Sequence, residues 1–245
     1  MKITTGSKDF DEFLEGGYEI DVITTLYGPG ASGKTNLCLI AVAEQAARGK
    51  KIIYMDTEGG FSIERLNQLT AGNINPLMKN IFLLKATTFS EQRQAFSKLI
   101  EIVKKTKDLG LIVIDSLVML YRLDLGESVT EGDNLKAKML NNSLSIQMRI
   151  LNEICRKREI PIIITDQVYS EFLSKEDFEA GKEKKVAMVG GDIIKYWSKC
   201  IIELKNLGEG KRIATIKKHR SLPEKNLAFY INDEGLTKEK KFKIF

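Results

Sequence analysis

The chain is poor in the residues that mark secreted, zinc-bound or membrane proteins. Its 245 residues include only three cysteines, Cys38, Cys155 and Cys200, and no two of them form a Cys-x-x-Cys pair. This spacing predicts neither a disulfide framework nor a zinc site, so we expect three buried thiols. No apolar run reaches the roughly 18–20 residues of a membrane helix, and residues 1–10 lack the apolar stretch of a secretory signal. We expect a cytoplasmic protein that does not enter a membrane.

Histidine and proline are also scarce, and neither positive nor negative residues are in large excess. The formal net charge is +5, which permits binding to nucleic acid but does not require it. The one histidine, His219, lies among basic residues, and we expect a surface position at a strand end with no catalytic role. The basic tail 237–245 contains two phenylalanines. A final strand with a solvated face explains it at least as well as a DNA-binding patch.

Apolar segments alternate with amphipathic segments along the first two hundred residues. Short apolar runs predict buried strands at 21–27, 50–56, 109–116 and 160–168. Helical spacing of apolar residues predicts helices over 7–17, 33–48, from 88 onward, and 134–158. This alternation is typical of an α/β fold with a mostly parallel central sheet and helices on both faces.

The pattern changes after Ser198. Three strand-like segments, 199–206, 211–218 and 226–232, follow one another with short connections. They predict a C-terminal antiparallel extension of the sheet. No linker interrupts residues 1–245, so we expect one domain.

The segment "GPGASGKT" is the strongest single motif in the chain. It fits G-x-x-x-x-G-K-[ST] and lies between a predicted strand and a predicted helix. Its glycines let backbone N–H groups wrap phosphates at a helix N-terminus. Lys34 would reach the β- and γ-phosphates, and the Thr35 hydroxyl would bind Mg²⁺. The predicted ATP-binding residues of this loop are Gly28, Pro29, Gly30, Ala31, Ser32, Gly33, Lys34 and Thr35.

Three polar residues at other strand ends suit nucleotide chemistry. Asp115 ends the buried strand "LIVID", where an acid can support the metal. Glu58 follows the strand 50–56 and can accept a proton from an attacking water. The amide of Gln167, which ends "IIITDQ", can bond the γ-phosphate. An exposed loop acid and a strand-end polar residue are the alternative interpretations of Glu58 and Gln167.

These segments occur in an order and spacing that resemble the RecA/RadA recombinase core. The resemblance covers nearly the whole chain, and it is greatest to the short archaeal paralogues of RadA. It implies a RecA-like P-loop ATPase core that binds ATP and Mg²⁺. The matching segments are "GPGASGKT", "YMDTEGGFSIER", "LIVIDS", "ITDQV", "VGGDIIKYWSK" and "GKRIATIKKHRSLPE".

The resemblance also implies residue roles. Glu58 matches the catalytic glutamate, and Gln167 matches the glutamine that couples the γ-phosphate to the DNA loop that follows. Arg65 matches the arginine that lies against adenine, with Gln68 one turn further on. Lys218 and Arg220 resemble cations that related ATPases extend to a neighbour's γ-phosphate, where they stabilise transition-state charge. A solvated strand end is the alternative for these two residues.

The chain departs from the family pattern in several places. The N-terminal helix-hairpin-helix domain of RadA and the Phe-x-x-Ala hook of its linker have no counterpart, and residue 166 is Asp where recombinases commonly have Asn. The segment 121–135, which corresponds to the first DNA loop, contains four acids and one basic residue, Arg122. We expect it to bind DNA phosphates poorly. In the second loop, 169–191, acids nearly cancel lysines, while Phe172 and Phe178 could stack bases or pack onto the body. The four acids of the first segment are Asp124, Glu127, Glu131 and Asp133.

Together these features predict an ATP-binding DNA repair and recombination protein, an accessory or regulator of homologous recombination. We expect weak Mg²⁺-dependent ATPase activity, modest DNA binding without sequence specificity, and a possible homo-oligomer. The resemblance implies RadA and a Holliday-junction resolvase as partners. Two alternatives stay open: a full DNA-dependent strand-exchange recombinase, and a KaiC-like ATPase switch that does not act on DNA.

Overall fold

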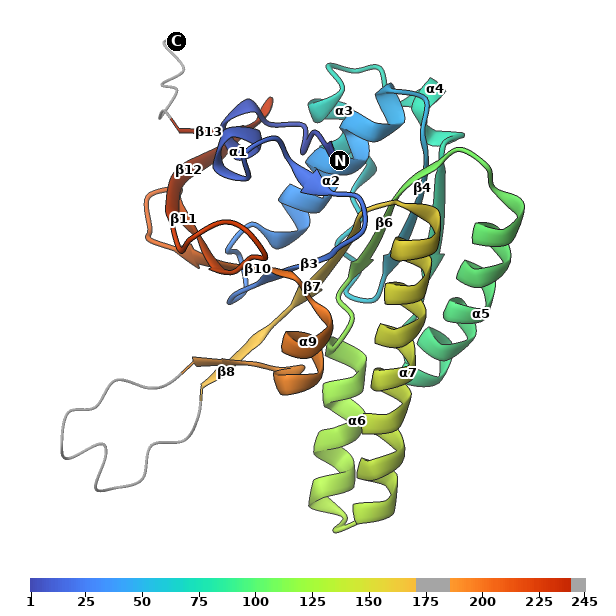
Figure 1. Ribbon diagram of the computed structural model, residues 1–245. Coiled ribbons are helices and arrows are strands. Elements are labelled where there is room, and N and C mark those ends of the chain that lie inside the picture. The colour runs from blue at the N-terminus through green and yellow to red at the C-terminus, as the bar shows by residue number, and fades with distance from the viewer. Residues whose placement is uncertain (171–185, 239–245) are drawn as a thin grey trace, which may run out of the picture.

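The computed structural model describes residues 1–170 and 186–238, arranged around one large sheet (Figure 1). The nine strands that the described residues contribute to this sheet lie in the order β13-β12-β11-β10-β3-β7-β6-β4-β5. From β10 to β5 all neighbours are parallel, whereas β10, β11, β12 and β13 pair antiparallel. The predicted α/β fold with a mostly parallel sheet and a C-terminal antiparallel extension is confirmed.

The strand bounds follow the predicted apolar runs closely. The strands of the large sheet are β3 (Ile23–Tyr27), β4 (Lys51–Asp56), β5 (Ile81–Lys85), β6 (Leu109–Asp115), β7 (Ile162–Asp166), β10 (Cys200–Asn206), β11 (Lys211–Lys218), β12 (Asn226–Asn232) and β13 (Gly235–Thr237). Two small antiparallel pairs lie outside it. They are β1 (Lys2–Ile3) with β2 (Tyr18–Glu19), and β8 (Val168–Ser170) with β9 (Val186–Met188). The sequence did not predict β5, β13 or the small pairs.

Helices cover both faces of the sheet, as predicted. The side chains of each central strand point alternately to the two faces, and both faces are covered, which explains why these strands are buried and rich in apolar residues. The helices are α1 (Lys8–Phe13), α2 (Lys34–Ala47), α3 (Ile63–Leu69), α4 (Asn75–Met78), α5 (Phe89–Lys105), α6 (Met119–Thr130), α7 (Asn134–Arg158) and α9 (Gly191–Trp197). Ile112 and Ile114 join the apolar cluster beneath α5, α6, α7 and α9, whereas Leu111 and Val113 join the cluster beneath α1 and α2.

The three cysteines are buried and free, as predicted. Burial raises the pKa of the Cys155 thiol to about 11 and that of Cys200 to about 12. In the part of the chain that the structure describes, no helix is long and apolar enough to span a membrane.

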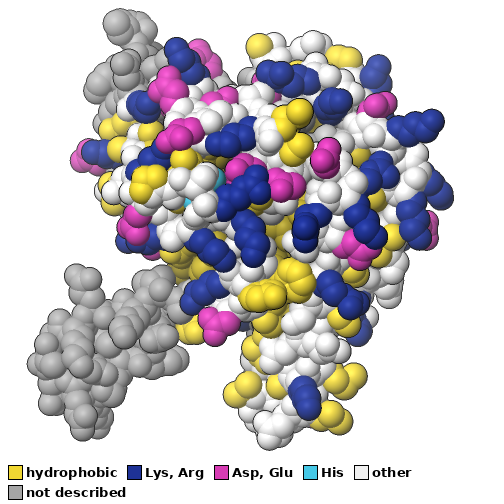
Figure 2. Space-filling model, in the orientation of Figure 1, with side chains coloured by type: hydrophobic (Ala, Val, Ile, Leu, Met, Phe, Trp, Pro, Cys, Tyr) yellow, Lys and Arg dark blue, Asp and Glu magenta, His cyan; other side chains and the backbone are white. Residues whose placement is uncertain are grey.

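The segment predicted to be the first DNA loop is largely helical. Its residues form α6, which packs against α7 as a hairpin that extends away from the sheet (Figure 1). Figure 2 shows hydrophobic side chains around the end of this hairpin. Its large exposed apolar residues are Leu123, Val129, Leu135, Met139 and Ile146. Lys136 forms ion pairs with Glu127 and Glu131, so part of the acidic charge is balanced within the hairpin.

Some expectations concern residues outside those that the structure describes. They are the stacking roles of Phe172 and Phe178, the charge balance of 171–185, and the tail from 239 to 245.

Candidate functional site: a phosphate loop and its neighbours

The phosphate loop connects β3 to α2 at the carboxyl edge of the sheet. Its conformation requires glycine at two positions. A Cβ on Gly28 would lie 2.1 Å from the carbonyl oxygen of Leu204. Gly33 has a φ of 104°, and a Cβ there would lie 2.9 Å from Ile231 Cδ1. Larger residues would therefore displace the loop from β10 and β12 or strain its backbone.

Lys34 lies within this loop rather than in solvent. Its Nζ donates to the carbonyl oxygens of Gly28 at 2.8 Å and Pro29 at 2.9 Å. Burial lowers the pKa of the Lys34 ammonium, and the nearby Glu58, Asp115 and Asp166 oppose that shift. A cation held at the start of a helix, among backbone N–H groups, favours phosphate oxygens as ligands.

The hydroxyl of Ser32, also in the loop, is a second group that suits a phosphate ligand. The Ser32 side chain is buried, and its hydroxyl has no hydrogen-bond partner among the described residues. An unpaired buried hydroxyl costs free energy unless a ligand or water satisfies it. Lys34 and Ser32 therefore offer donors that suit phosphate oxygens.

The two predicted magnesium ligands face the same small space. A Cβ on Gly60 would lie 3.5 Å from Thr35 Oγ1 and 3.8 Å from Asp115 Oδ2. Asp115 is held in place, because its carboxylate accepts from Tyr54 Oη at 2.8 Å and from Thr165 Oγ1 at 2.5 Å. The described residues contain no cluster of three or more His, Cys, Asp or Glu that could hold a metal by itself. These residues suit a magnesium ion that is bound together with the triphosphate.

The segment that carries Glu58 is organised by Asp56. One Asp56 oxygen accepts the backbone N–H groups of Glu58, Gly59 and Gly60, and the other accepts that of Phe61. Four hydrogen bonds from successive amides fix the turn that follows β4. Asp56 was not among the predicted site residues, although an acid followed by two nearby glycines is a signal for such a turn.

The structure brings Glu58 and Gln167 together. Gln167 Nε2 donates to Glu58 Oε1 at 2.9 Å, across the carboxyl ends of β4 and β7. The backbone oxygen of Gln167 accepts from Val189 N at 3.0 Å, next to β9. Gln167 therefore touches both the predicted catalytic acid and the described end of the second loop.

Arg65 and Gln68 also lie together, on α3. Arg65 Nη1 donates to Gln68 Oε1 at 2.9 Å, Nε donates to Asn36 Oδ1 at 2.9 Å, and Nη2 donates to the Asn232 carbonyl at 2.7 Å. Asn36 directly follows Thr35 on α2. The guanidinium group is thus fixed beside the helix that begins in the phosphate loop.

Lys218 and Arg220, the two cations predicted to act in trans on a neighbour's γ-phosphate, have different surroundings. Lys218 Nζ donates to the Lys195 carbonyl at 2.5 Å, and burial together with Lys199 lowers the pKa of Lys218. Arg220 instead forms a bidentate pair with Asp21 and a 2.9 Å bond to Glu19 Oε1. The structure gives Arg220 partners within its own chain, and these contacts compete with any contact to a neighbour.

His219 differs from its prediction. Its side chain is 2% exposed, and Nδ1 accepts from the backbone N–H groups of Ser221 and Leu222. Burial lowers its pKa. The expectation of a surface histidine is therefore wrong, because the turn after β11 folds back over the imidazole.

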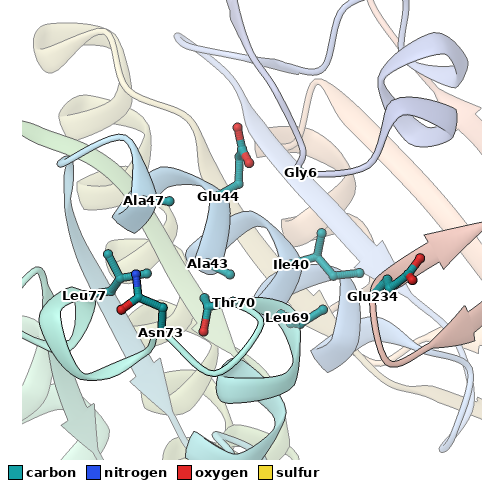
Figure 3. A pocket seen from close by; sticks show the side chains of 10 residues that line it. All are labelled: Gly6, Ile40, Ala43, Glu44, Ala47, Leu69, Thr70, Asn73, Leu77 and Glu234. Atoms are coloured by element: carbon teal, nitrogen blue, oxygen red, sulfur yellow. The ribbon is translucent and has the colours of Figure 1, made fainter.

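A separate cavity of about 250 Å³ lies beside α2. Figure 3 shows its lining, which includes Ile40 and Glu44 of α2 and Thr70 and Asn73 after α3. The residues that line it include none of the predicted site residues. It is distinct from the phosphate loop.

Known proteins resemble this chain over nearly its whole length. A model of the family described as Rad51 matches residues 1–239. The chain belongs to the Rad51 family. Within it, the chain is 39% identical over 239 residues to the DNA repair and recombination protein RadB of Methanobrevibacter smithii, covering 96% of this chain and 95% of the relative. The RadB of Methanocaldococcus jannaschii is 36% identical over 225 residues, covering 92% and 97%.

A solved Rad51-family structure agrees with the fold. The crystal structure titled "Crystal structure of the RadB recombinase" superposes with a TM-score of 0.72 at 32% identity, covering 96% of this chain and 98% of that one. The predicted resemblance to RecA/RadA recombinases, and to the short archaeal paralogues among them, is confirmed. Proteins of this family share a RecA-like nucleotide-binding core.

Proposed function

We propose that this chain is an ATP-binding DNA repair and recombination protein of the RadB kind, in which the bound nucleotide controls contact with DNA. The relatives that it matches over most of their length carry that name. The observation that carries the proposal is the 2.9 Å bond between Gln167 and Glu58. It joins the nucleotide site to the strand pair that begins the second loop.

The proposed nucleotide is Mg-ATP. The phosphate loop and Lys34 would hold the phosphates, Thr35 and Asp115 would hold the magnesium, and Arg65 with Gln68 would face the adenine. Magnesium supplies charge neutralisation at the phosphates when it is bound. Glu58 orients and deprotonates the attacking water.

Hydrolysis by the isolated chain is proposed to be slow. Transfer of a γ-phosphoryl group is fast only when an additional cation stabilises the charge of the transition state. In this proposal Lys218 of a neighbouring copy supplies that cation. Turnover therefore depends on association of the protein.

The proposed DNA contact is modest and not sequence-specific. Arg122 lies 5.9 Å from the ring centre of Tyr169, a cation–aromatic pair at the base of α6 and β8 that can stack a base and pair a phosphate. Elsewhere on the α6–α7 hairpin, Lys136 is paired with Glu127 and Glu131, and large apolar side chains are exposed, a surface that gathers phosphates poorly. We infer that this hairpin faces a protein, and the partners proposed by resemblance are RadA and a Holliday-junction resolvase.

Calorimetry with Mg-ATP tests the nucleotide site. Wild-type protein should bind, and Lys34→Ala should weaken binding by roughly 10–100-fold, since hydrogen bonds to a charged group contribute about 1.5–3 kcal/mol. Lys8→Ala is the matched control, because it removes an exposed lysine from α1. Unchanged binding by Lys34→Ala would show that the site is assigned wrongly.

ATP turnover with and without single-stranded DNA, measured together with molar mass in solution, separates the proposed function from its alternatives. The proposed function predicts slow turnover with weak stimulation by DNA. A full recombinase predicts turnover that rises steeply with DNA, together with filaments. A KaiC-like switch predicts rings and no DNA binding at low salt.

A further inference from the structure

Asp166 is a buried acid at the centre of the site that the proposed chemistry does not use. It is the last residue of β7, between the phosphate loop and the end of the second loop, and it is fully buried. Most aspartates avoid such positions, because an ionised carboxylate loses its hydration there. A buried acid at a strand end beside a ligand site therefore invites a functional explanation.

Asp166 contacts both functional segments directly. Its backbone oxygen accepts from Gly28 N, the first residue of the phosphate loop, at 3.4 Å. Its side-chain Oδ2 accepts from Gly190 N, at the start of α9, at 3.2 Å. A Cβ on Gly190 would lie 2.0 Å from Ile194 Cγ1, so the Gly190 backbone has little freedom to move independently. Asp166 thus joins the beginning of one segment to the end of the other.

The second carboxylate oxygen is not satisfied. Asp166 Oδ1 is buried and has no hydrogen-bond partner among the described residues. A neutral carboxylic acid tolerates this environment better than a carboxylate, because only the carboxylate carries a full charge that needs donors.

The charged and titratable groups around Asp166 come from each neighbouring strand end. The positive charge of Lys34, in the phosphate loop, favours the ionised form of Asp166. The same ammonium also interacts electrostatically with Glu58 and Asp115. Tyr27, at the end of β3, interacts with Asp166 and with Glu203 of β10. Desolvation outweighs the Lys34 charge and the backbone donors, and it raises the pKa of Asp166 to about 7.

A triphosphate in the loop would shift the equilibrium between ionised and neutral Asp166 toward the neutral acid. Its oxygens attract the Lys34 ammonium, which now bonds the Gly28 and Pro29 carbonyls. They also add negative charge close to Asp166. Both effects disfavour the ionised carboxylate, so the neutral acid becomes more populated.

We propose that Asp166 takes up a proton when a nucleotide fills the phosphate loop, and that the proton changes how Asp166 holds Gly190 at the end of the second loop. This inference rests on the proposed nucleotide site. The charged carboxylate accepts strongly from Gly190 N, whereas the neutral acid accepts weakly and can donate. Asp166 is a positioning residue, because it acts through Gly28 and Gly190 and not on the reacting atoms.

Calorimetry in buffers of different ionisation enthalpy measures the proton uptake directly. At about pH 7.5, binding of Mg-ATP to the wild-type protein should take up roughly half a proton more than binding to Asp166→Asn. The amide keeps an acceptor for Gly190 N but does not titrate. Tyr27→Phe is the matched control, since it removes the neighbouring phenol and should keep the uptake. Equal uptake by wild type and Asp166→Asn overturns the inference.

If Asp166→Asn does not fold, protonation of Asp166 can be measured on the wild-type protein alone. Infrared difference spectra of the wild-type protein should gain a protonated carboxyl band when Mg-ATP binds, and the absence of that gain overturns the inference. Hydrogen exchange at Gly190 should then become faster with nucleotide at about pH 7.5, and Asp166→Asn should not show this change. If wild-type protein binds no Mg-ATP at all, the proposed function fails instead, and the two failures are distinguishable.

Discussion

The side-chain amide of Gln167 donates a 2.9 Å hydrogen bond to the carboxylate of Glu58. The two residues are far apart in the sequence, and they meet because parallel strands β4 and β7 end at the same edge of the sheet. This contact fixes one Glu58 oxygen and leaves the other for a water molecule. A change in the position of Glu58 is therefore felt first by Gln167, whose backbone carbonyl bonds Val189 N.

Glu58→Gln should lower ATP turnover by about 10²–10⁴-fold, the usual contribution of a general base. The neutral glutamine can still accept from Gln167, but it cannot take a proton from water. Affinity for Mg-ATP should stay within about twofold, because Glu58 does not hold the phosphates. Single-turnover kinetics and calorimetry measure the two quantities separately. Unchanged turnover would exclude Glu58 as the group that activates water.

Asp56→Ala should reduce both stability and turnover. The carboxylate accepts four backbone N–H groups, and its removal leaves several of them unsatisfied. We expect the free energy of unfolding to fall by about 2–4 kcal/mol, and turnover to fall although Glu58 itself is intact. Asp56→Asn should be milder, since one acceptor oxygen remains. Denaturant unfolding and ATP turnover of the two variants test this, and equal stability of Asp56→Ala and wild type would contradict it.

Sequence periodicity and motif spacing were sufficient for the central architecture. The buried strands β3, β6 and β7 are rich in apolar and β-branched residues, and α7 begins and ends where its amphipathic pattern does. The phosphate loop was predictable because its glycines and Lys34 have fixed spacing. These features depend on local sequence, so no tertiary information was needed.

Other features depend on contacts that the sequence does not show. Strand β5 lies at the edge of the sheet and is only half buried, so its pattern is weak. Helix α6 contains Gly126 and little amphipathic character, and it is helical because it packs on α7. The Arg220 pairs with Glu19 and Asp21 join segments from opposite ends of the sequence. Tertiary packing overrode local propensity at these positions.

The stability of the nucleotide-free protein should fall as the pH rises toward and through neutrality, because of Asp166. Its pKa in the folded protein is about 7, above the usual value near 4 for an unfolded chain. A raised pKa means that the protonated group stabilises the fold fully below about pH 4, and that this contribution is lost as the pH rises through about 7. Between about pH 5.5 and 8, we expect a loss of about 2 kcal/mol in the free energy of unfolding.

Asp166→Asn is the control for this pH dependence. Its amide is neutral throughout, so its stability profile should lack the decline that wild type shows. Other titrating groups, including His219, are common to both proteins and cancel in the comparison. Urea unfolding at a series of pH values measures the difference. Parallel profiles for the two proteins would show that Asp166 has an ordinary pKa.

Lys218→Ala and Arg220→Ala should have different effects, although both residues match the predicted trans cations. Arg220 pairs with Glu19, whose side chain is 8% exposed. Removal of the guanidinium leaves that carboxylate buried without its strongest donor, so stability should fall by about 1–3 kcal/mol at every protein concentration. Lys218 bonds a backbone carbonyl at the surface, so Lys218→Ala should leave stability nearly unchanged. It should lower turnover only under conditions where the protein associates, because the ammonium acts on a neighbour's nucleotide.

Turnover measured across a range of protein concentrations, together with molar mass, distinguishes these outcomes. Lys217→Ala is the matched control, because Lys217 is the adjacent exposed lysine and pairs with Glu224. It should behave as wild type in both assays. A Lys218→Ala variant that loses the same fraction of turnover in dilute monomer as in the associated state would place Lys218 in its own chain's chemistry, and the trans assignment would then be wrong.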